Sequence, residues 1–471
     1  RASSWTNVPL IYINELNAKY TQWARKTLSK IEIKALEKEG RVTPGKNLSL
    51  LKPSEFGAAS KLRFHTEAKF LVQTEGDFYT EMYDYLKREL GVKSLIAANS
   101  DCDHYYNGYA LLSNLSKFDY IDGHAYWHIY DDSGKELYGR KDNIPMVTLP
   151  QMSNPVKLSR SAVQGKPYTV SEINNGNYND YYSEGVPLTG AYSALQDWDG
   201  VFYFTLSHTS ANNWNTFYPG GLDLVVDPIR MANMASSGLM YRRSDIQPSG
   251  STVLRGYNQN DMIEGLRDTL SAMPFYTKNF NQLTPLIQKT RIASFTEQIN
   301  DFPKIKDETK ITSETGELTW HNKYNNSFVE VSTPNSEALI GFLPQSPNLK
   351  HLQAKLKNDF GSITITSLDG KALHSAEKIL LVTTARAGMK GMKWTEGQTK
   401  LLERGGRPTT IEVVSGEISL SGLAGAKSLI IEPLDGAGNP LRSITRTVEN
   451  GKVIFPVGED VTVWYYLTVK R

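Results

Sequence analysis

The sequence predicts a two-part fold, an α/β part built on parallel strands followed by an all-β sandwich. Over roughly the first three-fifths of the chain, short apolar runs alternate with longer amphipathic segments, which is the pattern of βαβ units. From about Lys310 onward, short strands follow one another with turn sequences between them. We therefore expect one part at residues 1–309 and a second at residues 310–471.

The first part contains about five short apolar runs that are typical of buried strands. Either a closed α/β barrel or a doubly wound sheet would produce this pattern, and a full barrel has eight strands. Either the chain is an incomplete barrel without its first three βα units, or it has further strands that the apolar pattern does not reveal. The expected strands are 8–14, 94–98, 118–124, 167–173 and 201–206, and the expected helices are 19–39, 77–90, 185–198 and 222–241.

The second part shows short strands separated by turn signals such as Leu434–Gly438 (LDGAG) and Glu449–Gly451 (ENG). This spacing indicates a sandwich or jelly-roll-like module. The expected strands are 317–321, 327–332, 362–367, 378–384, 409–414 and 429–432.

Composition removes several classes of function. The 52 basic and 50 acidic side chains nearly balance, which argues against nucleic acid or an anionic membrane as the main partner. The longest apolar runs are far shorter than the ~20 residues that a membrane helix needs. The only cysteine, Cys102, allows neither an intrachain disulfide nor a thiolate metal cluster. No HExxH, GxSxG, GxGxxG or P-loop pattern appears, so we expect no metal and no cofactor.

Two glutamates are candidates for acid–base or nucleophilic chemistry. Glu172 stands at the end of the strand PYTVSEINN, where the carboxyl ends of barrel strands form active sites. Glu15 follows Asn14 at the end of the first expected strand, in IYINELN. Retaining glycosidases use two carboxyl groups ~5–5.5 Å apart. From spacing alone, either glutamate is equally well explained as a solvated charge at a strand end.

Polar and aromatic residues gather at the expected strand ends, as in a sugar-binding cleft. Many of the 25 Tyr and 8 Trp residues cluster with Asn, Asp and His between residues 104 and 218. Sugar rings stack on aromatic faces while their hydroxyls bond to amides and carboxylates, although Tyr and Trp are also ordinary half-buried residues. The candidate substrate-binding residues are Asn14, Asn99, His124, Tyr126, Trp127, Asn174, His208 and Trp214.

The runs FDYIDGHAYW and PYTVSEINNGNYNDYYSEGVPLTGAYSALQDWDGVFYFTLSH resemble the last strands of clan-A retaining glycoside hydrolases of the cellulase and β-galactosidase type. This resemblance implies a TIM-like barrel with Glu172 as nucleophile, Asn14 and Glu15 as amide donor and acid/base, and His124 and Tyr126 as a His/Tyr motif. The segment from KILLVTTARAGMKGMKW to VTVWYYL resembles the β-sandwich that often follows such barrels. The family's first three barrel strands have no counterpart.

We therefore expect a hydrolase that cleaves β-linked polysaccharide, glucanase- or cellulase-like, by double displacement. One alternative is a catalytically weakened relative that binds carbohydrate, and another is a structural role in which the sandwich mediates assembly. A polysaccharide substrate favours a secreted or periplasmic location, although the first residues show no signal-peptide pattern. An incomplete barrel leaves open strand edges. Either the chain's own sandwich or the helices of residues 222–273 could cover them, or a second copy could, and we expect the second copy, a homodimer.

Overall fold

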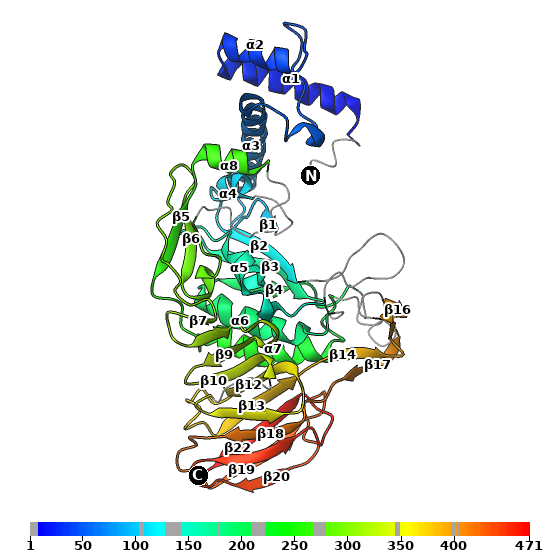
Figure 1. Cartoon of the computed structure of the whole chain (residues 1–471), viewed down its shortest axis with the longest axis vertical. Helices are drawn as coiled ribbons and strands as arrows, with labels where there is room; N and C mark the ends of the chain where they lie inside the picture. The colour runs from blue at the N-terminus through cyan, green and yellow to red at the C-terminus, as the bar shows by residue number, and fades with distance from the viewer. Residues whose placement is uncertain are drawn as a thin grey trace.

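The computed structural model describes residues 8–102, 108–127, 143–176, 179–208, 222–267, 279–343, 349–396, 401–403 and 405–471. The molecule is elongated, with the N-terminal helices at one end and the C-terminal strands at the other (Figure 1). A parallel sheet and its helices lie between them. Among the described helices, none combines the length and the apolar character that crossing a membrane requires.

The N-terminal end consists of α1 (Leu10–Thr27), α2 (Lys30–Glu39) and the long α3 (Lys61–Asp84). The predicted strand at 8–14 is wrong, because Leu10–Asn14 form the first turns of α1. The apolar positions continue at helical spacing through Leu16, Tyr20 and Ala24, which pack against Phe70 of α3.

The helix predicted at 19–39 is two helices, because the chain breaks at Leu28 and restarts at Ser29. Ser29 caps α2 through a capping box with Glu32. The helix predicted at 77–90 corresponds to the end of α3 and a π-helical turn at Tyr85–Glu89. The break and the cap direct α2 back along α1.

Four parallel strands form the central sheet in the order β1-β2-β3-β4. Three of the predicted strands are confirmed with shifts of a few residues, as β2, β3 and β4. The strand predicted at 94–98 is wrong, because Ile96 exchanges hydrogen bonds with Asp119 in front of β2 and the ladder starts later. The described strands form an open sheet, so a closed barrel is not confirmed. The bounds are β1 (Ser100–Cys102), β2 (Ile121–Trp127), β3 (Tyr168–Asn175) and β4 (Gly200–Tyr203).

Among the described residues, helices cover one face of this sheet and not the other. Ile121, Ala125, Val170 and Ile173 belong to a single hydrophobic cluster on the covered face. The helix predicted at 185–198 is confirmed as α6. The helix predicted at 222–241 corresponds to α7, which begins six residues later than expected. The helices of this region are α4 (Tyr109–Leu115), α5 (Asn154–Ser159), α6 (Gly185–Leu195), α7 (Pro228–Arg242) and α8 (Gln259–Gly265), and a small parallel pair joins β5 (Thr252–Gly256) to β6 (Lys289–Ser294).

The C-terminal region is all-β. A nine-stranded antiparallel sheet has the order β20-β19-β22-β13-β12-β10-β9-β8-β7 and packs against the three-stranded sheet β11-β18-β21. The strands expected from turn signals are confirmed, although β17 starts and ends three residues earlier than the predicted range 409–414. The bounds are β7 (Lys310–Thr312), β8 (Leu318–His321), β9 (Phe328–Ser332), β10 (Ser336–Phe342), β11 (Leu352–Leu356), β12 (Phe360–Ser367), β13 (Lys378–Thr384), β14 (Ala387–Lys390), β15 (Lys393–Trp394), β16 (Leu401–Glu403), β17 (Gly406–Ile411), β18 (Gly416–Leu420), β19 (Ser428–Pro433), β20 (Ile444–Thr447), β21 (Val453–Val457) and β22 (Trp464–Lys470).

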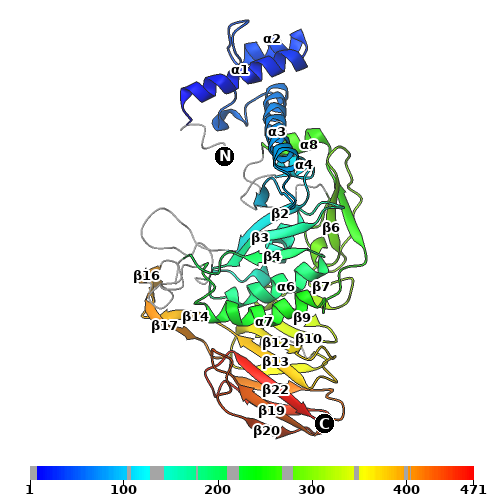
Figure 2. The same ribbon diagram turned by 180° about the vertical axis from the view of Figure 1, so that it is seen from behind.

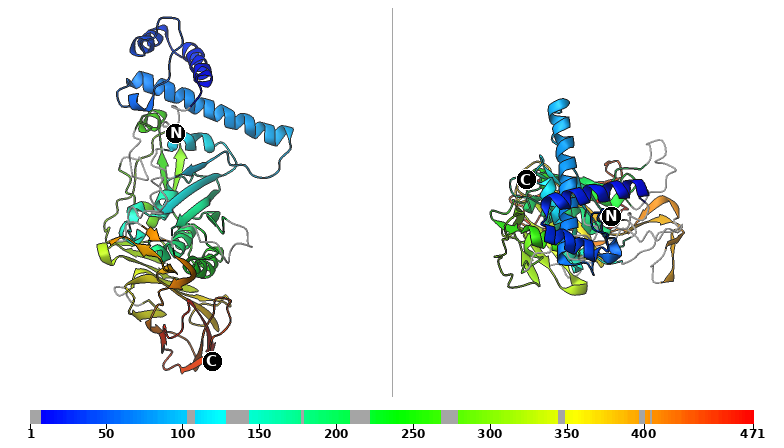
Figure 3. Two further views of the ribbon diagram at one scale, coloured as in Figure 1. Left: turned by 90° about the vertical axis from the view of Figure 1, so that its right-hand side faces the viewer. Right: turned by 90° about the horizontal axis from the view of Figure 1, so that it is seen from above.

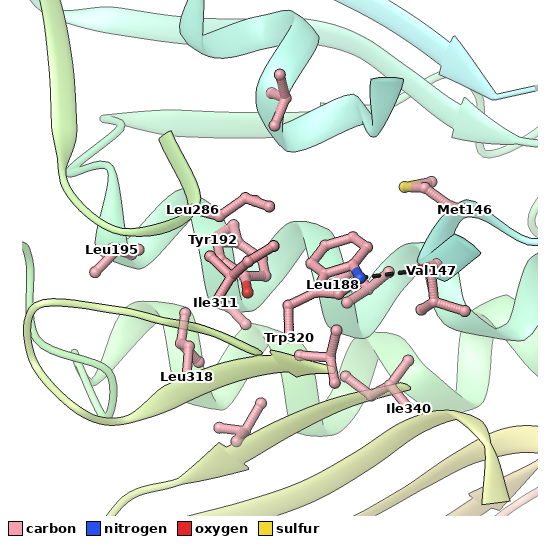
Figure 4. Close-up of a cluster of buried hydrophobic side chains, with 14 of the residues drawn as sticks. Met146, Val147, Leu188, Tyr192, Leu195, Leu286, Ile311, Leu318, Trp320 and Ile340 are labelled. Atoms are coloured by element: carbon pink, nitrogen blue, oxygen red, sulfur yellow. Dashed lines mark hydrogen bonds between the residues drawn. The ribbon is translucent and has the colours of Figure 1, made fainter. Parts of the chain in front are cut away.

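The α/β region and the first strands of the large sheet share one hydrophobic core (Figure 4). Trp320 of β8 is fully buried, lies close to Leu188 and Tyr192 of α6, and donates a 2.8 Å hydrogen bond from Nε1 to the carbonyl of Val147. The boundary at residues 309/310 stays a prediction, because this core joins the two sides of it.

Candidate active site

The uncovered face of the central sheet is polar. Asp122, His124 and Tyr126 alternate along β2, so their side chains project from the same face. The intervening residues Gly123 and Ala125 face the helices and are buried. Alternation therefore sorts β2 into a polar face and an apolar one.

A β-bulge in β3 brings two consecutive side chains to this polar face. Asp122 pairs with Thr169 and His124 pairs with Glu172, so β3 has one more residue than β2 over this stretch. Bulges are rare between parallel strands and frequent beside active sites, where they change the direction of a side chain. Here the extra residue lets both Ser171 and Glu172 reach the side chains of β2.

Two side chains of β2 approach the carboxylate of Glu172. Tyr126 donates from its hydroxyl to Oε2 at 2.6 Å, and Nδ1 of His124 lies 3.4 Å from the same oxygen. The side chain of Glu172 remains 33% exposed, which leaves the carboxylate open to a ligand. Bonds of this kind to a charged acceptor fix its orientation strongly. Glu172 is therefore held in place and still accessible.

Asp122 lies deeper in the same network. Its Oδ1 accepts hydrogen bonds from the Thr169 hydroxyl at 2.6 Å and the Ser171 N–H at 2.9 Å, and its Oδ2 accepts from the Ser171 hydroxyl at 2.6 Å. Burial acts to raise the pKa of Asp122, but bonds from His124, Ser171 and Thr169 outweigh it and hold the pKa below its usual range. Asp122 is thus an ionised group with its oxygens occupied.

Ser171, His124 and Asp122 do not form a catalytic triad of the serine-hydrolase type. Such a triad needs the serine at one imidazole nitrogen and the acid at the other. Here the Ser171 hydroxyl at 2.8 Å and Asp122 Oδ2 at 3.3 Å both approach Nε2 of His124. The hydroxyl is also engaged as a donor to the acid, so it is not activated as a nucleophile.

Asn14 and Glu15 are not part of this site. Both lie on α1, at the end of the molecule away from β3 (Figure 2). The side chain of Glu15 is 59% exposed and pairs with Lys19 one turn later at 3.0 Å. The expectation that these residues end a barrel strand is wrong, because the segment is helical. Their predicted roles as amide donor and acid/base lose this structural basis.

Asn99 and Trp127 also lie elsewhere than expected. Asn99 precedes β1, at the amino end of the sheet, and donates to the hydroxyl of Tyr79 at 3.1 Å. Trp127 is 1% exposed, faces the helices, and donates to the carbonyl of Ile144 at 2.9 Å. It is one residue out of phase with Tyr126, and strand alternation sends it to the covered face.

Asn174 is fully buried. Its amide donates to the carbonyls of Phe204 and Leu222 at 2.6 and 2.9 Å, and its Oδ1 accepts from Arg230 at 2.7 Å. His208 follows β4 at the carboxyl end of the sheet, is half-exposed, and has Nδ1 3.0 Å from Asp223. Trp214 lies outside the described residues. Of these three, His208 is accessible and Asn174 is occupied by protein groups.

One exposed aromatic residue at the site was not anticipated. Phe202 of β4 is 61% exposed, two residues after Gly200, which pairs with Thr169 beside Asp122. Strand alternation places Phe202 on the polar face, so it can offer a ring to a sugar. The alternation within GVFY was the available signal. Within the part of the chain that the structure describes, no group of three His, Cys, Asp or Glu side chains could hold a metal ion.

Comparisons with known proteins add little. No family model matches the chain, and no curated protein matches it significantly. Among solved structures, a GH30 endoxylanase from Clostridium papyrosolvens C71 is 9% identical, with 82% of this chain and 92% of that chain covered and a TM-score of 0.17. A TM-score this low carries no argument about fold or function.

Proposed function

We propose that the polar face of the β1–β4 sheet is the nucleophile side of a retaining glycosidase site, with Glu172 as nucleophile and β-linked polysaccharide as substrate. The observation that carries the proposal is the pair of contacts to Glu172 Oε2, from the Tyr126 hydroxyl at 2.6 Å and from His124 Nδ1 at 3.4 Å. The resemblance of this segment to clan-A hydrolases assigns the same role to Glu172.

The arrangement suits attack on an anomeric carbon. A carboxylate nucleophile forms a bond to that carbon while the bond to the leaving oxygen breaks, and the resulting glycosyl ester is then hydrolysed. Tyr126 and His124 fix one oxygen of Glu172, which limits the carboxylate to few orientations. The exposed ring of Phe202 provides a stacking surface beside it.

The leaving oxygen needs a proton in this mechanism, and the described side chains around Glu172 do not include a suitable acid. Asp122 is the other nearby carboxyl group, but it accepts three hydrogen bonds and its pKa is lowered, so it is ionised and has no proton to give. The acid/base of the proposed site is therefore unassigned.

That gap supports a second candidate function. A chain with the aromatic and polar face but without an acid/base would bind carbohydrate and turn it over slowly. The specific observation is Glu15, which lies on the exposed face of α1 instead of beside Glu172.

Reducing-sugar release distinguishes the two candidates. The chain should be incubated with β-glucans, xylan, mannan and aryl glycosides, with the Glu172→Gln variant as control. Release that depends on Glu172 supports hydrolysis. Retention of a polysaccharide in affinity electrophoresis, without release, supports the binding role. If the chain neither releases reducing sugar nor retains a polysaccharide, both candidate functions are refuted.

A further inference from the structure

The charge state of His124 follows from counting the protons around it. The Ser171 hydroxyl has one proton, and it is directed at Asp122 Oδ2, an ionised acceptor 2.6 Å away. At 2.8 Å from His124 Nε2, the same hydroxyl oxygen can therefore only accept. Nε2 must then have a hydrogen, and Asp122 Oδ2 also lies 3.3 Å from this nitrogen.

The second ring nitrogen faces another carboxylate. Nδ1 of His124 lies 3.4 Å from Glu172 Oε2, which already accepts from Tyr126. An ionised carboxylate has no proton to donate, so an unprotonated Nδ1 would place two lone pairs against each other. Protonation of Nδ1 turns this repulsion into an ion pair. Both nitrogens of the ring are thus best satisfied in the imidazolium form.

Within the residues that the structure describes, a further charged group near this part of β2 lies on the helix side. Nζ of Lys157 in α5 is 3.5 Å from the carbonyl of Tyr126 and 5.9 Å from the ring of Trp127, which is on the covered face. The His124 ring therefore lies between Asp122 of β2 and Glu172 of β3, with the sheet between it and this lysine.

We propose that Asp122 is a positioning residue which, together with Ser171, holds His124 as an imidazolium that donates to Glu172. Asp122 acts through His124 and does not touch the reacting atoms. The consequence for Glu172 is a fixed carboxylate with a cation beside it. The kinetic consequence rests on the proposed function, whereas the charge state of the ring does not.

Nuclear magnetic resonance of the histidine-labelled chain, without any substrate, tests the charge state of the ring directly. Nitrogen shifts report whether each ring nitrogen has a proton, and the His124→Gln variant identifies the signal among the 8 histidines. We expect both nitrogens of His124 to stay protonated above pH ~6.5, where an unperturbed ring is half titrated. In Asp122→Asn the titration midpoint should fall by about 1 unit or more, since an opposite charge at this distance has been removed.

The matched control is Asp435→Asn, which removes another aspartate that accepts several hydrogen bonds, in a turn of the C-terminal region. It should leave His124 unchanged. A single proton on the ring at pH 6, or the same midpoint in Asp122→Asn, would overturn the proposal. If circular dichroism shows that Asp122→Asn is unfolded, Ser171→Ala decides, because Ser171 is exposed. A lowered midpoint supports the proposal and an unchanged one overturns it.

Kinetics separate this inference from the proposed function. If the chain hydrolyses glycosides, the alkaline limb of its kcat/KM profile should move to lower pH in Asp122→Asn by the same amount as the ring midpoint. An imidazolium without hydrolysis would leave the inference standing and remove the function. Hydrolysis with a neutral His124 ring would leave the proposed function standing and overturn the inference.

Discussion

The hydroxyl of Tyr126 lies 2.6 Å from Oε2 of Glu172 and joins the two central strands of the sheet across its uncovered face. The bond exists because a bulge in β3 brings Glu172 level with His124 and close to the polar side chains of β2. A phenol and an imidazole on one carboxylate oxygen leave the rest of that carboxylate for a substrate.

Glu172→Gln should preserve folding and lower kcat by several orders of magnitude on any substrate that the chain hydrolyses. A neutral amide cannot form the glycosyl ester. The measurement is reducing-sugar release, with circular dichroism to confirm the fold. Turnover near that of the unaltered protein would remove Glu172 from the mechanism.

Tyr126→Phe should keep the ring and lose the bond to Glu172. Hydrogen bonds to charged groups contribute about 1.5–3 kcal/mol, so we expect kcat/KM to fall by about 10- to 100-fold. Tyr181→Phe is a suitable control, because Tyr181 lies outside the site and contacts Phe342 and Phe360 of the large sheet. Equal losses in both variants would indicate a general effect on folding.

Glu15→Ala should change activity by less than about twofold. The side chain is exposed and its partner is Lys19, and pairs of this kind on a helix contribute about 0.3–0.5 kcal/mol. Azide should not rescue the variant on an activated aryl glycoside, because no acid/base has been lost. A large loss with azide rescue would show that α1 reaches the site and that Glu15 is the acid/base.

The contrast between Glu15 and Glu172 shows what the sequence could and could not predict. Both follow short apolar runs, and such runs do not distinguish a strand from one face of a helix. The strand before Glu172 is flanked by others that pair with it, whereas Leu10–Asn14 is followed by Leu16, Tyr20 and Ala24 at helical spacing. Continuing the pattern past residue 14 would have indicated the helix.

The alternation of side chains along a strand correctly predicts part of the site. Residues two apart on a strand share a face, which is enough to group Asp122 with His124. The same rule turns Trp127 away from Tyr126, although the cluster of aromatic residues suggested otherwise. The bulge that directs Glu172 toward Tyr126 could not be predicted, because one extra residue in a parallel pair has no local sequence signature. The shared core around Trp320 likewise depends on contacts between distant segments.

Stability should fall as the pH rises from about 5 to 8. Burial raises the pKa of Glu184 to about 8, against the effect of hydrogen bonds from the N–H groups of Met146 and Val147. Above pH 4.5 the unfolded chain releases this proton while the folded chain keeps it, so unfolding becomes easier until the folded carboxyl also ionises. Glu67, whose pKa burial raises to about 7, acts in the same sense.

Urea unfolding at pH 5 and pH 8, followed by tryptophan fluorescence, measures this slope. Glu184→Gln should flatten this slope, at the cost of lower stability at pH 5. The amide nitrogen of the glutamine would face a backbone N–H that in the unaltered protein donates to a carboxyl oxygen of Glu184. Glu417→Gln, which changes an exposed carboxylate of β18, should leave the slope unchanged. If the unaltered protein is less stable against urea at pH 5 than at pH 8, the prediction is contradicted.

The last prediction is the homodimer that an open sheet implies. The uncovered face of β1–β4 is polar, so it does not itself demand cover, but α3 extends beyond the body of the molecule (Figure 3). Its second half and the segment after it expose Phe78, Met82, Tyr85 and Leu90 at helical or near-helical spacing. Apolar patches of this kind are rarely left bare on soluble monomers.

We expect light scattering coupled to size exclusion to give a mass near twice 52.7 kDa at micromolar concentration. A dimer that persists on dilution needs an interface of roughly 2,000 Å² or more, since weaker contacts bury less. The double variant Phe78→Ser, Met82→Ser should then dissociate, because both side chains lie on the exposed stripe of α3. Ile454→Ser removes an exposed apolar side chain from β21 and should leave the mass unchanged.

A mass of 52.7 kDa for the unaltered protein rules out the dimer. A dimer that survives the double variant places the interface elsewhere, with the outer strands β1 and β4 of the described sheet as the next segments to alter.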